Sequence, residues 1–228
     1  MSKANAVAIK ETNLPAFVSN IAIKGNGTGN EKVRAGDLQI PRLSLLQDLS
    51  PEVSERKPEF ITGAKPGMIL NKLTGELFES MFVINLRFDF AWTAWKKRKL
   101  GGGLFGTFTT EEEAVNALEA EGMDLGHYDL VESPTHYVLL LDDDGKPTMP
   151  AIIDMPVTKA KVSRNWNSLI AKQGDEYDRF AWVWLLESKF EENNNAQGYF
   201  NYGVKLLGAA PEELFEEAKR FHEQVKNS

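Results

Sequence analysis

Apolar and polar residues alternate along residues 82–97, and this is the clearest periodicity in the chain. A period of two is typical of a β-strand that has one face on the core and one toward solvent. The alternation predicts that even-numbered residues up to Trp92 face the core, and that odd-numbered residues, among them Arg87, Trp95 and Lys97, face outward. The pattern therefore predicts a long strand that exposes an indole among cations.

Turn residues and helical spacing predict the elements on either side of this strand. Thr74–Gly75 and Asp144–Gly145 each separate two apolar runs, which indicates two hairpins. Apolar residues at helical spacing, together with capping residues, predict three helices. The expected helices cover residues 109–122, 157–171 and 211–226. Two further strands are expected on the two sides of an Asn-rich loop near residue 194.

The order of these elements shows no regular βαβ repeat, so we expect an α+β fold around an antiparallel sheet. An OB-like five-stranded barrel with added helices, one of them C-terminal, fits this order. The expected organisation is a flexible N-terminal arm over residues 1–36, an OB-like single-strand-binding domain over residues 37–208, and a C-terminal amphipathic helix over residues 209–228.

Composition narrows the possible functions. The 228-residue chain contains no Cys, which excludes disulfides, thiolate chemistry and Cys-ligated zinc. The N-terminus lacks the apolar region of a secretory signal, and charges interrupt every apolar run before it is long enough to span a membrane. We therefore expect a soluble, cytoplasmic protein without a membrane partner.

The distribution of charge is more informative than its sum. A formal net charge of −7 argues against a wholly basic nucleic-acid-binding protein. However, residues 87–100 and 157–172 are rich in cations, poor in acids, and contain Trp. Cations that pair with phosphates and rings that stack on bases are what a single nucleic-acid strand requires. The candidate DNA-binding residues are Arg87, Trp95, Lys96, Lys97, Arg98, Lys99, Phe105, Lys159, Lys161, Arg164, Trp166, Tyr199 and Tyr202.

Trp166 and the glycine run that follows the first cationic segment each allow a purely structural interpretation. Trp166 shares helical spacing with Val162 and Ile170, so a position in the core is the alternative to a DNA contact. The run Gly101–Gly103 is either a flexible turn between strands or a loop whose bare backbone approaches phosphates.

The sequence predicts no catalytic residue, metal site or cofactor. The cluster formed by His127, Asp129, Glu132 and His136 has no recognised metal-ligand spacing. A metal-dependent nuclease built on Asp129, Glu132, His136 and Asp154 remains one alternative function. A protein that inhibits a target enzyme by protein–protein contact, with acids that mimic DNA, is the other.

Four segments carry a resemblance to a known group of proteins. They are IPRLSLLQDLSPEV, AKPGMILNKLTGE, KAKVSRNWNSLI and ESKFEENNNAQGYFNYGV. Together they resemble bacteriophage single-stranded DNA-binding proteins of the OB-fold type. The resemblance implies a protein that coats exposed DNA in the host cytoplasm during phage DNA replication or recombination, with other replication or recombination proteins as possible partners. It places Lys159, Lys161, Arg164, Trp166, Tyr199 and Tyr202 near the strand.

The end of the chain departs from this group. Many such proteins end in a flexible acidic tail that recruits replication enzymes, whereas this chain ends in a predicted helix of mixed charge. The departure puts recruitment through a free tail in doubt. It leaves subunit contacts in a homo-oligomer as the role expected of the final helix.

Overall fold

The computed structural model describes residues 6–7, 28–33, 38–193 and 196–226, so the expected N-terminal arm lies almost entirely outside the described residues. The strands are β1 (Ala6–Val7), β2 (Arg42–Leu45), β3 (Ile69–Asn71), β4 (Leu77–Phe78), β5 (Ser80–Lys96), β6 (Leu104–Phe108), β7 (Tyr128–Leu141), β8 (Pro147–Asp154), β9 (Trp182–Glu192) and β10 (Gly198–Ala209). The helices are α1 (Glu111–Ala120), α2 (Ala160–Ala171) and α3 (Glu212–Lys226). The predicted α+β class, the two hairpins and the three helices are thus confirmed.

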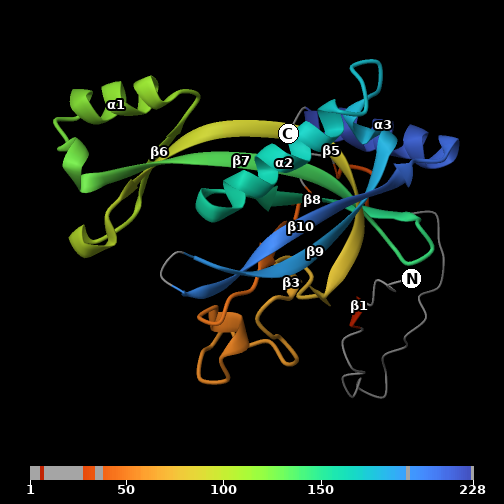
Figure 1. The fold of residues 1–228 in the computed structure, drawn as a ribbon, viewed down its shortest axis with the longest axis horizontal. Helices are drawn as coiled ribbons and strands as arrows, with labels where there is room; N and C mark the ends of the chain where they lie inside the picture. Colours follow the sequence, from red (N-terminus) through yellow and green to blue (C-terminus); the bar gives the residue numbers. More distant parts are fainter. Residues whose placement is uncertain (1–5, 8–27, 34–37, 194–195, 227–228) are drawn as a thin grey trace.

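The ten described strands form one sheet in the order β1-β4-β3-β2-β8-β7-β5-β9-β10, with β6 beside β5. The sheet curls into a half-barrel (Figure 1). Its curvature brings β10 back toward the chain just after β2. There the Gln47 amide bridges the gap, because its Nε2 donates to the Phe200 carbonyl and its Oε1 accepts from the Phe200 N–H, both at 2.9 Å.

The expected five-stranded antiparallel barrel is therefore wrong. The sheet has twice as many strands in the described residues, and β2 pairs with β8 in parallel, through Arg42 opposite Ile152 and Leu43 opposite Ile153. The strand pairs that extend the sheet join segments far apart in the chain, and local patterns do not encode such pairing.

Both faces of the sheet are covered where the strands are longest. The core between the sheet and α2 includes Val83 and Trp166, and the core between the sheet and α3 includes Ile84 and Val225. The pairing of β5 with β7 shifts between Asn85 and Arg87, which leaves Leu86 as a one-residue bulge. A bulge of one residue reverses which residues face which side.

The burial observed along β5 differs from the alternation expected from the sequence. Val83 and Asn85 are fully buried although they were expected to face outward, because helices cover both sides of the sheet at this point. Phe90 is 38% exposed although it was expected in the core. The period of two is interrupted at Leu86, and β5 has no single buried face.

A buried chain of hydrogen bonds attaches α2 to the sheet. Arg179, in the 3-10 turn η6 (Arg179–Ala181), donates to Asn85 Oδ1 at 3.1 Å. The amide of Asn85 then donates to His136 Nδ1 at 2.9 Å, so the ring carries its proton on Nε2 and donates to Ser163 Oγ at 2.8 Å. The His136 ring also stacks on Trp166, with 4.8 Å between ring centroids. These contacts fix the position of α2 against β7.

The far ends of β5 and β7 leave the half-barrel and, with β6 and α1, form a projection that we call the arm, residues 92–132 (Figure 1). A capping box starts α1, because the Thr110 hydroxyl accepts from the Glu113 N–H while the Glu113 carboxylate accepts from the Thr110 N–H. Ala114 and Leu118 of α1 are fully buried, as is Ala94 of β5. The arm therefore has a small core of its own.

His136 should make the protein sensitive to mild acid. Burial, with a smaller contribution from the charge of Arg179, lowers the pKa of His136 to about 3. Because the unfolded chain binds this proton near pH 6.5 and the folded chain does not, the free energy of unfolding should fall by about 1.4 kcal/mol per pH unit below pH 6.5. Urea unfolding between pH 6.5 and 5, where most carboxylates are still ionised, measures this slope.

The matched variants are His136→Gln and His127→Gln, which remove a buried and an exposed imidazole respectively. His136→Gln should be less stable at pH 7 but should lose most of the slope, whereas His127→Gln should keep it. An unchanged slope in His136→Gln would show that the acid sensitivity arises elsewhere.

Candidate nucleic-acid interface

The arm tip, residues 95–104, exposes two large apolar side chains next to each other. Trp95 is 44% exposed, and its indole N–H donates to Thr93 Oγ1 at 3.1 Å. Leu104 of β6 lies opposite Trp95 in the ladder and is 53% exposed. The outward position expected for Trp95 is where the structure places it. Its ring is held by a hydrogen bond at one edge while the remainder stays accessible.

The cationic run follows Trp95 directly and turns through the 3-10 segment η3 (Arg98–Leu100). Lys97 folds back on the arm, where its Nζ donates to the Gly126 carbonyl at 2.7 Å and lies 4.0 Å from Asp129. Lys96, Arg98 and Lys99 are exposed. Within the described residues, no carboxylate lies within 4 Å of their charged nitrogens. Three cations at the tip therefore remain available to an anionic partner.

The glycine run shapes this turn. Gly101 and Gly103 have φ values of 104° and 111°, a left-handed region in which residues with a side chain are strained. A Cβ atom added at either position would meet no atom within 4 Å, so the space beside the loop is open. Both properties suit a loop whose bare backbone lies next to a ligand.

Two other predicted residues of the first segment serve the fold. The half-buried Phe105 ring packs against Tyr128, with 5.6 Å between centroids. Arg87 lies away from the tip, where it donates to the Val225 carbonyl at 2.9 Å and to Asp89 at 2.9 Å. Arg87 thus holds the C-terminal end of α3 against the sheet.

Carboxylates pair with two of the four cations of the second basic segment. Lys161 Nζ lies 2.8 Å from Glu191 Oε2, and Arg164 Nη1 lies 3.1 Å from Glu132 Oε2. The Tyr199 hydroxyl also donates to Glu191, at 2.9 Å. Hydrogen bonds from Lys161 and Asn201 lower the pKa of Glu191 to about 2, so this carboxylate stays ionised. The Lys161 and Arg164 cations therefore offer less to a phosphate than their number suggests.

Trp166 and Tyr202 lie in the core between α2 and the sheet. Trp166 is fully buried and Tyr202 is 2% exposed, so neither ring can stack on a base in this conformation. For Trp166 the structure favours the core position that its helical spacing allowed. Burial raises the pKa of the Tyr202 hydroxyl well above its usual range.

Lys159 differs from the other cations of this segment. It ends the 3-10 turn η5 (Val157–Lys159), and its Nζ lies over the Tyr202 ring, 5.5 Å from the centroid. Burial lowers its pKa, and among the described residues no carboxylate lies within 4 Å of it. It lines a shallow hollow of about 600 Å³ together with Gln47, Thr158, Tyr199 and Phe200, among other residues.

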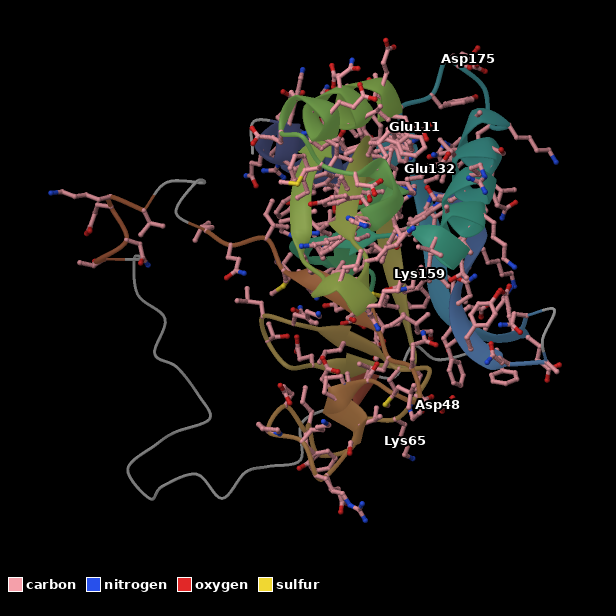
Figure 2. The ribbon with its side chains drawn as sticks, turned by 90° about the vertical axis from the view of Figure 1, so that its left-hand side faces the viewer. Asp48, Lys65, Glu111, Glu132, Lys159 and Asp175 are labelled. Carbon is pink, nitrogen blue, oxygen red and sulfur yellow. The ribbon has the colours of Figure 1, made fainter. Side chains whose placement is uncertain are left out.

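Of the predicted residues, those that remain accessible and without an offsetting charge lie mainly in two places, the arm tip and the hollow beside α2. Figure 2 looks at the molecule from the arm side and shows Glu132 of the arm above Lys159 of the body. The Arg164–Glu132 ion pair joins the arm to the body. Sequence reasoning missed Leu104 and Gln47, because the register that places Leu104 beside Trp95 and the curl that brings Gln47 to β10 are not local features.

The residues of the alternative nuclease site do not converge. His136 is buried and bonded to Asn85 and Ser163, Glu132 pairs with Arg164, and Asp154 pairs with Arg42. In the described part of the chain, no three His, Asp or Glu side chains gather as metal ligands would. No helix among the same residues is both long and apolar enough to cross a membrane.

Comparison with known proteins supports a bacteriophage origin. Residues 8–228 match the family model of the Pam3 phage gp34-like proteins. No curated protein and no solved structure matches the chain. Because the family model covers nearly the whole sequence, the chain belongs to the Pam3 phage gp34-like protein family.

Proposed function

We propose that this protein binds single-stranded DNA without sequence preference, in a non-catalytic role during phage DNA replication or recombination. One observation carries the proposal: at the tip of a projecting arm, an exposed indole lies beside three exposed cations that have no carboxylate partner in the described part of the chain. In an acidic chain of net charge −7, such a site is a local exception that a polyanion would recognise.

Each part of the tip has a chemical role in this proposal. Lys96, Arg98 and Lys99 neutralise successive phosphates, and Trp95 stacks on a base of any identity. Because phosphate contacts and stacking do not read base edges, binding at this tip is independent of sequence. Leu104 extends the apolar surface on which the base lies.

The hollow beside α2 supplies the second contact. A half-buried ammonium group without a carboxylate partner is costly to maintain, and an incoming phosphate would relieve that cost. Lys159 is therefore the residue of the second segment best suited to meet DNA. Lys161 and Arg164 would have to leave Glu191 and Glu132 before they could contribute.

Two alternatives predict different results in simple assays. A metal-dependent nuclease would cut labelled DNA in the presence of Mg²⁺ or Mn²⁺, whereas the proposed binder would leave it intact. A DNA-mimicking inhibitor of a host enzyme would ignore oligonucleotides and retain a host protein in a pull-down. The dispersed positions of Glu132, His136 and Asp154 make the nuclease the weaker of the two.

The three available cations should determine the salt dependence of binding. Replacement of Lys96, Arg98 and Lys99 with Ala should weaken binding to a dT oligonucleotide and reduce the slope of log K against log salt by about 2, at about 0.7 per phosphate contact. Fluorescence anisotropy of a labelled oligonucleotide at several salt concentrations measures both quantities.

The matched control replaces Arg56, Lys57 and Lys65, three exposed cations away from the arm, with Ala. Lys65 lies at the opposite end of the molecule from Glu132 in Figure 2. The control changes the net charge by the same amount and should leave the slope nearly unchanged. Equal loss of affinity in the two variants would mean that overall charge, and not the arm tip, governs binding.

Trp95 should contribute by stacking. Trp95→Ala should weaken oligo-dT binding by about 1–3 kcal/mol, or roughly 5- to 150-fold, without a change in salt slope. The control Tyr177→Ala removes another exposed aromatic ring, which packs on Trp182 away from the arm, and should have little effect. Full affinity in Trp95→Ala would remove the indole from the interface.

A further inference from the structure

The two longest paired strands, β5 and β7, place the arm tip at one end of the molecule and the β7–β8 hairpin at the other. Lys96 pairs with Tyr128 at the arm, and Phe82 pairs with Leu141 at the other end of the same ladder. A 14-residue strand spans roughly 40 Å at about 3.3 Å per residue. Figure 1 shows the arm and the β7–β8 hairpin at opposite ends of the sheet.

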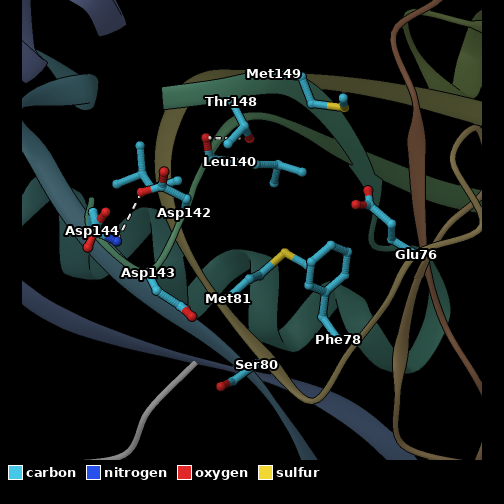
Figure 3. Close-up of a pocket in the computed structure, with 11 residues that line it drawn as sticks. Glu76, Phe78, Ser80, Met81, Leu140, Asp142, Asp143, Asp144, Thr148 and Met149 are labelled. Carbon is cyan, nitrogen blue, oxygen red and sulfur yellow. Dashed lines mark hydrogen bonds between the residues drawn. The ribbon is translucent and has the colours of Figure 1, made fainter. Parts of the chain in front are cut away.

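The end away from the arm contains an apolar pocket of about 400 Å³, which we call the β7–β8 pocket. Its apolar lining includes Phe78, Met81, Leu140 and Met149, and Figure 3 shows the Phe78 and Met81 side chains close together. Met81 and Leu140 are nearly buried and Phe78 and Met149 are half-buried, so the pocket is a recess that reaches the core. Such recesses receive the apolar side chains that anchor protein interfaces. Methionine side chains adapt their shape and make favourable contacts with aromatic rings.

Carboxylates surround this apolar lining. They belong to Glu76, Asp142, Asp143 and Asp144. Asp142 shapes the hairpin, because its Oδ1 accepts from the N–H groups of Asp144 at 3.0 Å and Lys146 at 2.8 Å. Lys146 Nζ lies 3.9 Å from the Asp144 carboxylate, and in the described residues no cation lies within 4 Å of Asp143 or Glu76. The pocket edge is therefore strongly negative.

The arm tip complements this pocket in apolar surface and in charge. It presents exposed Trp95 and Leu104 for the apolar lining, and Lys96, Arg98 and Lys99 for the carboxylates. We propose that the arm tip of one copy of this chain docks in the β7–β8 pocket of a second copy. The tip cannot reach the pocket of its own chain, because the β5–β7 ladder holds the two roughly 40 Å apart.

The geometry of this contact determines the type of assembly. The two contacting surfaces are different, so each docked pair still has one unused arm and one unused pocket. Such a head-to-tail contact forms open chains unless the rotation between copies closes a ring. The contact uses residues of the proposed DNA interface but does not require that the protein bind DNA, and DNA and a neighbouring copy would compete for the same tip.

A charge-swap experiment tests the docking. The arm variant carries Arg98→Glu and Lys99→Glu, and the pocket variant carries Asp143→Lys and Asp144→Lys; all four positions are exposed, and circular dichroism checks that both variants fold. Sedimentation velocity at low salt should show concentration-dependent association of the wild-type protein and loss of association in each variant alone. An equimolar mixture of the two variants should associate again, because it restores an intact arm and an intact pocket on different chains.

Three results would overturn the docking: a wild-type protein that stays monomeric at high micromolar concentration, a variant that associates as the wild type does, or a mixture that stays monomeric. Oligo-dT binding separates this proposal from the previous one. The pocket variant should keep its affinity for a short oligonucleotide, whereas the arm variant should lose it. Association without DNA binding would remove only the proposed function, and DNA binding without association would remove only the docking.

Discussion

The ladder between β5 and β7 is the constraint on which the rest of the structure depends. One half of it forms the middle of the half-barrel, where Val83 and Ile84 are buried on opposite faces. The other half leaves the body and carries Trp95 and Lys96 outward. Because two paired strands bend far less than a single chain, the ladder keeps the arm tip away from the acidic pocket at the other end of its own molecule.

The ion pairs of the body explain why the two basic segments differ. Exposed pairs such as Lys161–Glu191 and Arg164–Glu132 contribute only about 0–1 kcal/mol each to stability. Their larger consequence is electrostatic, since each cation is offset by an acid before any ligand arrives. Among the described residues, Lys96, Arg98 and Lys99 of the arm tip have no such partner, so in the proposed function these three cations attract the polyanion.

Local sequence features predicted local structure well. The turns at Thr74–Gly75 and Asp144–Gly145 and the capped helix at Thr110 depend on residues close together in the chain, and the structure has all three. The two turns and the helix cap required no knowledge of which strands become neighbours. Trp95 is exposed as expected, but the bulge at Leu86 reverses the faces of the strand, so the strand periodicity alone does not account for its position.

Features that depend on distant partners could not be predicted. The parallel pairing of β2 with β8, the bulge at Leu86 and the second helix-covered face together turned the expected small barrel into a curled sheet with two cores. The acids that neutralise Lys161 and Arg164 lie about 30 residues away in the sequence.

Amide hydrogen exchange of the intact protein with and without oligo-dT tests the central claim most directly. Protection should appear over residues 95–104, and protection elsewhere without any at the arm tip would contradict the account.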